Sequence, residues 1–562
     1  MTPIHSDPIE TMRLRSAAST LARVAVMASL AAIAPTAEAQ GESGAPTMIL
    51  TGGRIFTADS TRPWATAIAI RGERIVAVGT DAEVTALART RTRRIALGGR
   101  VVVPGFNDAH AHVGPGTPGA SFATGASPQP DPLFTVVLDS VRAIARRTPP
   151  GTWIMTEVAE RVLVDSNARR RVLDAAAPAH PVYLRGWSGH GAVLSTAALV
   201  SAKVDTLYDP VGGWLERDGA GRVTGRIDEY ALFGADSRIS AARTPAVVLR
   251  AFTGFAAEAT QFGITSVQNM STNLTPAQLA VVEKAGVLPL RHHLIPFEQT
   301  RVGRRDGIWN GVRGRTSRSR VGGAKWVLDG TPVERLALMR EPYADMPGWY
   351  GRANFPLDTV KAMLRDALRR GQQPMLHAVG DSTIALLFTA MRSVAPDSAW
   401  RRIRPRIEHG DNLMPDQFAD AKALGIVVVQ NPAHLSIVFR GTRWSEQRAT
   451  NSEQLRGIVE AGIPLAIGSD GPLNPGLNLM FATLNPANPA HALTREQAVI
   501  AYTRTAAYAQ HAERETGTLA PGMLADLAVL SQDVFTVPPQ ALPGTTSLLT
   551  LVGGRVTRNV LA

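Results

Sequence analysis

The middle of the chain alternates between short apolar runs of strand length and longer amphipathic stretches with a helical period. Residues 357–370 and 415–424, for example, place apolar side chains three and four positions apart, as one face of a helix requires. Repeated strand–helix units favour a parallel sheet, and eight of them predict an α/β fold of the closed (β/α)8 TIM-barrel type. An open, doubly wound sheet is the alternative. The eight runs are residues 101–103, 264–267, 288–295, 324–328, 374–377, 406–409, 426–429 and 465–468.

Both ends of the chain have a different pattern, with short β-type runs separated by glycine-rich turns. The segments Thr51-Gly52-Gly53-Arg54-Ile55 and Val552-Gly553-Gly554-Arg555-Val556 are even similar to each other. Two β-rich ends around a different middle predict one composite β-sandwich domain, built from residues 46–103 and 517–562. The TIM-barrel domain is then expected to span residues 104–516.

The first two barrel runs are unusually far apart. About 160 residues separate positions 103 and 264, which is far more than one strand-to-strand crossover needs. We therefore expect an insertion over residues 114–245, after the first barrel strand, with strands and helices of its own. Its first part, residues 114–132, is rich in glycine and proline and is predicted to form a loop.

The first 39 residues have the pattern of a signal peptide. Three arginines precede the apolar stretch 24–34, and Ala37-Glu38-Ala39 supplies the small residues of a cleavage site. We expect cleavage after Ala39 and export to the periplasm or the medium. The apolar stretch is short for a bilayer, so stable membrane insertion is not expected after cleavage. An uncleaved anchor or a buried helix is the alternative.

Composition excludes several kinds of site and partner. The chain has no cysteine, which rules out disulfides, lipid anchors on cysteine and thiolate metal ligands. The net charge is +12, but the basic residues are mostly dispersed, and no nucleic-acid partner is expected. A small-molecule substrate is the expected partner, and homo-oligomerisation is left open. One arginine-rich stretch, residues 301–320, follows the third barrel run and either steers anionic substrates or forms a solvated loop.

Five potential metal ligands lie at the ends of these apolar runs. His110 and His112 follow the first run at two-residue spacing, so both can face the same side of a strand. His377 and His409 end the fifth and sixth runs, and Asp470 follows the eighth. In a barrel the carboxyl ends of the strands share one rim, where the active site lies. Four imidazoles and a carboxylate at one rim predict a divalent-metal site and metal-assisted hydrolysis.

Lys325 is unusual because it lies inside an apolar strand-like run, where an unpaired charge is costly. The chain otherwise uses arginine for almost all of its positive charge. Unlike an arginine, a buried lysine can lose its proton. If carbon dioxide carboxylated Lys325, the resulting carbamate would be an anion able to bridge two metal ions. The alternative is an ion pair between Lys325 and Asp329.

Together these motifs resemble the amidohydrolase superfamily, in the YtcJ-like branch (amidohydrolase family 3) that includes the N-substituted formamide deformylases. The resemblance covers about residues 49–556 and implies a metal-dependent TIM barrel with a composite β-sandwich domain. It also implies that Lys325 is the carboxylated bridge and that the metal ligands are His110, His112, His377, His409 and Asp470. The matching segments are 104–112, Lys325 with Asp329-Gly330, 377–381, 406–409, 468–470 and 517–527.

Two loops near the expected substrate depart from the family pattern. Thr331-Pro332-Val333-Glu334-Arg335 stands where the family usually has a Ser/Gly-rich loop. Gly410-Asp411 follows His409, where a small residue and glutamine are commoner. These departures leave the substrate undefined but do not affect the predicted ligands.

The predicted reaction is hydrolysis of a carbon–nitrogen bond other than a peptide bond, with an N-formyl or N-acyl amide favoured. One or two divalent ions, with zinc as the default, would activate water and polarise the carbonyl. Asp470 is expected to bind metal and transfer the proton. His190 is a candidate for binding the carbonyl oxygen, its alternative being a loop histidine at a domain contact.

Other assignments of the same site remain open. Asp329 and His434 are candidates for substrate contact, although His434 also fits an ordinary loop role. The same ligand set would serve a dipeptidase, a cyclic amidase or a lactonase. An exported binding protein without catalysis is the alternative from another functional class.

Overall fold

The computed structural model describes residues 44–116, 119–122, 131–271, 274–286, 288–297, 300–301, 304–305, 318–437 and 440–561. Residues 45–562 form one compact unit. The predicted signal peptide, residues 1–39, lies outside the described residues, as do the side chains of residues 300–317 in the arginine-rich stretch. Among the residues described, none of the helices has the length and apolar character needed to cross a membrane.

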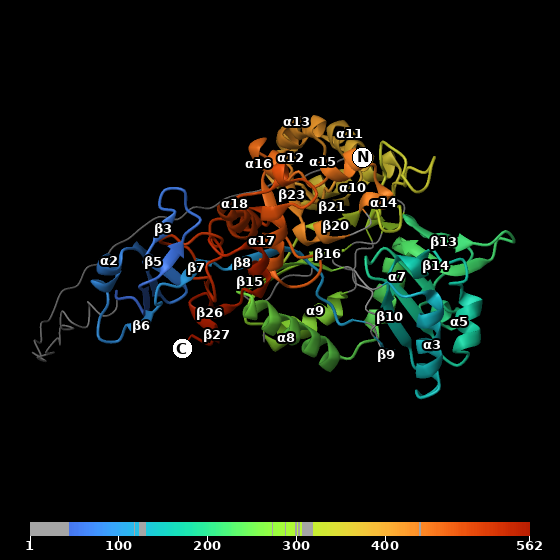
Figure 1. The fold of residues 1–562 in the computed structure, drawn as a ribbon, viewed down its shortest axis with the longest axis horizontal. Coiled ribbons are helices and arrows are strands. Elements are labelled where there is room, and N and C mark those ends of the chain that lie inside the picture. Colours follow the sequence, from blue (N-terminus) through green and yellow to red (C-terminus); the bar gives the residue numbers. More distant parts are fainter. Residues whose placement is uncertain are drawn as a thin grey trace, which may run out of the picture. The chain divides into compact units, whose positions relative to one another are not determined.

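Strands from the two ends of the chain share one six-stranded sheet, where the blue and red ribbons meet in Figure 1. A four-stranded sheet shares a core with it, and this core includes Leu50, Ile68, Val102, Leu527 and Leu551. In sheet order the six strands are β27 (Arg555–Asn559), β26 (Ser547–Val552), β25 (Leu527–Leu530), β7 (Val101–Pro104), β2 (Arg54–Phe56) and β3 (Trp64–Ala65). The other four are β5 (Arg74–Gly79), β4 (Ala67–Arg71), β1 (Met48–Thr51) and β6 (Arg93–Ala96).

The prediction that residues 101–103 form the first barrel strand is wrong. They belong to β7, which pairs with β2 and β25 in the sheet formed by the chain ends. The first strand of the parallel sheets is instead β8 (Phe106–Ala111). Gly105 separates the two strands, and a Cβ there would lie 2.2 Å from the Thr265 side chain. A glycine is therefore needed where the chain passes from one sheet to the next.

Eight parallel strands lie at or near the predicted runs, in two sheets, and the α/β class is confirmed. The first sheet has the order β19 (Ser319–Val321), β16 (Arg291–Pro296), β15 (Ile264–Ser271) and β8. The second has the order β20 (Ala324–Val327), β21 (Pro374–Ala378), β22 (Arg406–His409), β23 (Val427–Gln430) and β24 (Leu465–Ile467). The eight are these strands without the short β19. Helices between them include α8 (Pro245–Gln261), α9 (Pro276–Ala285), α10 (Leu357–Arg369), α11 (Asp381–Val394), α13 (Phe418–Leu424) and α16 (Leu455–Glu460).

The two parallel sheets contact each other at both of their edges. At one edge a parallel bridge joins Phe297 to Lys325. At the other, the Asp470 N–H donates to the His110 carbonyl oxygen at 2.9 Å, and the Ser469 N–H donates to Asp108 Oδ1 at 2.8 Å. These contacts hold the carboxyl ends of β8 and β24 next to each other.

The segment between β8 and β15 forms a separate mixed sheet with helices on both faces. Alternate residues of its strands point to different cores, because Leu184 packs in one cluster and Tyr183 in another. Helices α3 (Phe134–Ala145) and α5 (Arg170–Ala176) cover one face, and α6 (Thr196–Ser201) and α7 (Tyr230–Ala241) cover the other. The strand order is β13 (Gly213–Arg217), β14 (Val223–Glu229), β12 (Gly191–Leu194), β11 (Val182–Gly186), β10 (Ile154–Val158) and β9 (Ala120–Ser121).

Four charged residues connect this mixed sheet to the loops of the parallel sheets. Glu160, in α4 (Glu160–Leu163), pairs with Arg443 at the end of α14 (Arg440–Arg443). Arg335 lies 3.3 Å from Glu160 and 2.7 Å from Asp345, and Arg443 also pairs with Asp345. The group of Glu160, Arg335, Asp345 and Arg443 therefore joins three separate segments.

The contact between β24 and β8 gives a test of the packing. A Cβ added at Gly468 would lie 2.4 Å from the backbone nitrogen of His110 and 2.5 Å from its Cβ. We expect Gly468→Ala to lower the free energy of unfolding by about 1–3 kcal/mol, because the backbone of His110 must move. Chemical denaturation measures this change.

Gly471→Ala is the matched control. The nearest atom to a Cβ at Gly471 is the Ser469 carbonyl oxygen at 3.6 Å, which is ordinary contact. Equal stability of the two variants would show that the β24–β8 contact is not tight.

Candidate metal and catalytic site

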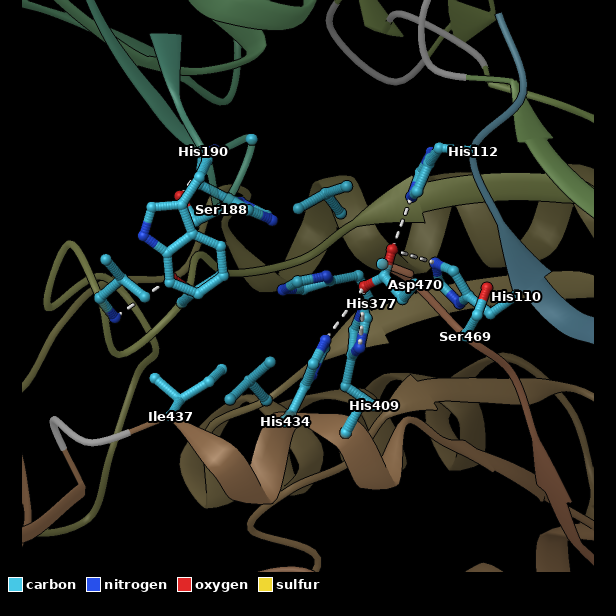
Figure 2. Close-up of a pocket in the computed structure, with 18 of the residues that line it drawn as sticks. His110, His112, Ser188, His190, His377, His409, His434, Ile437, Ser469 and Asp470 are labelled. Carbon is cyan, nitrogen blue, oxygen red and sulfur yellow. Dashed lines mark hydrogen bonds and ion pairs between the residues drawn. The ribbon is translucent and has the colours of Figure 1, made fainter. Parts of the chain in front are cut away.

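The carboxylate of Asp470 faces four imidazole rings (Figure 2). Asp470 Oδ1 lies 3.2 Å from His112 Nε2 and 3.7 Å from His110 Nε2. Its Oδ2 lies 3.7 Å from His409 Nδ1 and 3.8 Å from His434 Nε2. Two three-residue groups result, and within each group the ligand atoms all lie within 4.8 Å of one another. These groups are His110 with His112 and Asp470, and His409 with His434 and Asp470.

His377 and Lys325 line the same cavity from neighbouring strands, β21 and β20. The His377 ring lies 4.4 Å from the His409 ring, measured between centroids. Burial lowers the pKa of Lys325 to about 8, although the charges of Glu408 and Asp470 oppose this. Within the described residues, no ion pair joins Lys325 to Asp329, so the structure does not favour that alternative.

Three imidazoles of this site, those of His110, His377 and His409, favour the neutral form, which is the form that binds metal. Burial, helped by the charge of Lys325, lowers the pKa of His110 to about 4, and burial holds the pKa of His377 and of His409 well below the usual value. The Nε2 atoms of His110 and His377 are buried and form no hydrogen bond with the residues described. Buried nitrogens of this kind normally have a partner. Neutral imidazoles beside a carboxylate fit a divalent metal of the zinc type.

A fully buried ion pair supports His110 from below. Glu408 Oε2 lies 2.7 Å from His110 Nδ1, and Arg406 donates to both oxygens of Glu408, at 2.7 and 3.0 Å. Positions 406 and 408 point to the same side of β22 because side chains alternate along a strand. Although burial opposes it, the Arg406 charge holds the pKa of Glu408 at about 2. The anionic Glu408 keeps the proton of His110 on Nδ1 and leaves Nε2 free to face the cavity.

Two further residues position the ligands. Asn431 Oδ1 lies 2.9 Å from His409 Nδ1. Asp108 accepts hydrogen bonds from the backbone N–H groups of His110 and Ser469, and burial raises its pKa to about 6. Sequence analysis assigned no role to Glu408, Asn431 or Asp108. Polar residues inside otherwise apolar strand ends were the available signal for Asp108 and Glu408.

A cavity of about 720 Å³ joins the histidine group to the mixed sheet. In Figure 2, Ser188, His190 and Ile437 lie across the cavity from His110, His112 and Asp470. The apolar part of the lining includes Trp187, Phe233, Val327, Val333, Val379, Trp444 and Leu477. The cavity therefore has one end suited to metal and another end that contacts apolar and polar parts of a ligand.

His190 reaches this cavity from the loop between β11 and β12. Its Nδ1 lies 2.9 Å from Glu229 Oε1, and its ring centroid lies 4.7 Å from that of His377. Burial disfavours the charged ring, but the charges of Glu229, Glu334 and Asp470 outweigh this and raise the pKa of His190. Glu229 also accepts a hydrogen bond from Asn354 at 2.9 Å. A ring with a raised pKa and a carboxylate partner at Nδ1 therefore stands next to the metal-type site.

The contact of Asp329 with substrate stays a prediction. Asp329 is absent from the cavity lining, and its buried oxygens accept the backbone N–H groups of Leu338, Val379 and Gly380 at 2.9–3.1 Å. Its Oδ1 also lies 3.9 Å from Nε2 of the lining residue His377. Asp329 therefore holds the loops that follow β20 and β21. His434 does line the cavity, but it lies with Asp470 in a metal-type group rather than apart from it.

The arginine-rich stretch contributes little that can be placed at the cavity. Of its arginines, only Arg318 and Arg320 have described side chains, and neither lines the cavity. The Arg320 guanidinium donates to the carbonyl oxygen of Gln510. The predicted steering by the other arginines falls outside the described side chains.

Comparison with known proteins identifies the family. Residues 93–558 match the Amidohydrolase family. The chain belongs to this family. It is 26% identical over 515 residues to the N-substituted formamide deformylase of Arthrobacter pascens, covering 86% of this chain and 93% of that protein. It is 25% identical over 495 residues to the putative amidohydrolase YtcJ of Bacillus subtilis (strain 168), covering 83% and 90%. The predicted resemblance to family 3 of the amidohydrolases is confirmed.

The same fold occurs in a solved structure, that of an uncharacterized metal-dependent hydrolase from Pyrococcus horikoshii OT3. The TM-score is 0.67 at 20% sequence identity, and the match covers 88% of this amidohydrolase and 99% of that chain.

The contact between Glu408 and His110 gives a test of the ligand geometry. Glu408→Gln keeps the shape of the side chain but removes the charge that orients His110. We expect this variant to bind zinc about 10–100-fold more weakly, measured by competition with a chelator. Glu460→Gln, at an exposed position in α16, is the matched control and should bind zinc like the original protein. Unchanged affinity in Glu408→Gln would contradict the proposed support of His110.

Proposed function

We propose that this amidohydrolase is a metal-dependent enzyme that hydrolyses the carbon–nitrogen bond of N-formyl or N-acyl amides. The observation that carries the proposal is the carboxylate of Asp470, which faces four imidazoles at one end of a partly apolar cavity. The similarity to an N-substituted formamide deformylase over most of both chains supports the choice of bond.

The residues that would hold divalent metal are those of the two groups that share Asp470. We place His110 and His112 in the first group and His409 in the second, and we keep His377 and Lys325 as further ligands. His434 joins the second group as an addition to the ligands inferred from the sequence. When bound, one or two ions, zinc by preference, would make water a stronger nucleophile and polarise the substrate carbonyl. A carbamate on Lys325 would supply the anionic bridge between two ions.

Side chains of the protein would carry out the proton transfer and stabilise the developing charge. In this proposal Asp470 takes a proton from the attacking water and delivers it to the leaving nitrogen. The His190 ring donates a hydrogen bond to the carbonyl oxygen as negative charge develops there. The contact with Glu229 Oε1 orients His190 for this role.

The architecture and location that go with this function are also proposals. The bridge between Phe297 and Lys325 and the hydrogen bond from Asp470 to His110 support a closed barrel made of the two parallel sheets. The signal-peptide pattern supports export of the mature protein. We also propose the predicted domain limits. The composite β-sandwich domain has residues 46–103 with 517–562, the barrel domain has residues 104–516, and the insertion has residues 114–245.

Replacing the proposed proton carrier tests the mechanism. Asp470→Asn should lower kcat by about 10²–10⁴-fold, because an amide cannot accept the proton of the attacking water. Steady-state hydrolysis of N-formyl and N-acyl amides measures the change. Asp358→Asn is a matched control, since the Asp358 side chain is 93% exposed on α10. A kcat for Asp470→Asn close to that of the original protein would contradict the proton role.

Metal removal separates the enzyme from a binding protein. Chelation should abolish hydrolysis and lower the Tm, and added zinc should restore both, because a metal bound only to the folded state stabilises it. A screen should include dipeptides, cyclic amides and lactones beside N-formyl and N-acyl amides. Metal binding without hydrolysis of any of these compounds would instead favour the non-catalytic binding protein. Preference for a dipeptide or a lactone would favour the corresponding alternative activity.

A further inference from the structure

Glu334 is a buried carboxylate directly behind the wall of the cavity. Its side chain accepts hydrogen bonds from the hydroxyls of Ser188 and Thr331, and both of these residues line the cavity. Glu334 itself is only 7% exposed. Among the described residues, no lysine or arginine forms an ion pair with it. Buried carboxylates normally have a cationic partner, and burial raises the pKa of Glu334, although the charge of His190 and the two hydroxyls oppose this.

The two hydroxyls can offer only hydrogen-bond acceptors to a ligand. Each hydroxyl has one hydrogen and two lone pairs, and each hydrogen is already donated to Glu334. The Ser188 hydroxyl oxygen accepts the backbone N–H of His190 at 3.4 Å with one lone pair. The Thr331 hydroxyl oxygen accepts the backbone N–H of Val333 at 3.2 Å in the same way. A single acceptor position remains on each oxygen. This part of the wall therefore suits a group that donates hydrogen bonds and accepts none.

The neighbouring charged residues also favour a positively charged group of the ligand on this side of the cavity. Arg185 lies in the lining, but it is shared between two carboxylates, Asp236 at 3.2 Å and Glu157 at 3.8 Å. His190 Nδ1 lies 2.9 Å from Glu229 Oε1, and the charges of His190 and Arg226 also act on Glu334, although among the described residues neither forms an ion pair with it. In a poorly solvated wall the Glu334 carboxylate acts strongly on a ligand.

We propose that Ser188 and Thr331, backed by Glu334, form a subsite for an ammonium group of the substrate. The inference rests on the proposed hydrolysis of amides and narrows it to N-acylated compounds that carry a second, free amine. The ammonium donates to the two hydroxyl oxygens and brings a cation close to the Glu334 carboxylate, which forms no ion pair with a described lysine or arginine. In Figure 2, Ser188 lies on the side of the cavity opposite His112 and Asp470, so the free amine points away from the proposed metal ligands.

A pair of matched compounds tests this inference. One is an N-formyl diamine with a free ammonium at its far end, and the other carries a methyl group in place of that ammonium. We expect the original protein to hydrolyse the ammonium compound with a kcat/KM at least about 10-fold higher, because hydrogen bonds to a charged group are the stronger ones. Equal kcat/KM values for the two compounds would overturn the subsite while leaving amide hydrolysis intact.

Variants of the subsite should remove this preference. Glu334→Gln keeps the shape but loses the charge, and the ratio of the two kcat/KM values should fall toward one. Ser188→Ala and Thr331→Val should each reduce the same ratio in part. Ser436→Ala is the matched control, because the Ser436 hydroxyl also lies in the lining but donates to the Ala433 carbonyl oxygen at 2.6 Å. A ratio that is unchanged in folded Glu334→Gln, or reduced equally in Ser436→Ala, would overturn the proposal.

Ligand binding by the metal-free protein distinguishes failure of the proposed hydrolysis from failure of the ammonium subsite. If neither formyl compound is hydrolysed, the proposed function fails, and calorimetry with a simple alkylammonium ion then decides the subsite alone. Tighter binding to the original protein than to Glu334→Gln supports the subsite. Equal binding, or none to either protein, overturns it. Thermal unfolding of each variant confirms that the comparison is made between folded proteins.

Discussion

The buried ion pair between Arg406 and Glu408 is the contact on which the proposed metal site depends. Both side chains are fully enclosed, and charges removed from water are costly unless each is well paired. Arg406 meets this need from three sides, because it also donates to Gln268 of β15 and to the Ala109 carbonyl of β8. The same guanidinium thus links strands of both parallel sheets and fixes the carboxylate that orients His110. Geometry at the rim follows from a charge pair buried below it.

Local patterns in the sequence predict much of this structure, and non-local contacts limit the rest. Strand ends are visible locally, and for that reason His110, His377, His409 and Asp470 could be placed on one rim before their distances were known. A fully apolar run does not show which sheet a strand belongs to. The sequence therefore predicts Val101–Val103 in the barrel, although they lie in the sheet formed by the chain ends. The role of Glu408 depends on a histidine 298 positions away. The sequence predicts Asp329 as a candidate for substrate contact. Its hydrogen bonds to three backbone N–H groups cannot be predicted locally, because they come from residues 9 to 51 positions away.

The cavity divides its tasks between two parts of the chain. The parallel sheets supply the imidazoles and Asp470, whereas the mixed sheet supplies Ser188, His190 and Trp187. The group of Glu160, Arg335, Asp345 and Arg443 joins the two parts close to the lining residues Pro332 and Trp444. Substrate selection can therefore change through the mixed sheet and the loop after β20 without disturbing the residues proposed to bind metal. The departure of residues 331–335 from the family pattern falls in the loop after β20.

The sheet shared by the two chain ends has a consequence for how the protein is made. In this sheet β7 pairs with β25, and β25, β26 and β27 are synthesised more than 400 residues after β2 and β7. Until then the edge of β7 that pairs with β25 has no strand partner, and contacts between such distant segments form slowly. The six-stranded sheet can therefore be completed only after β25, β26 and β27 have been synthesised.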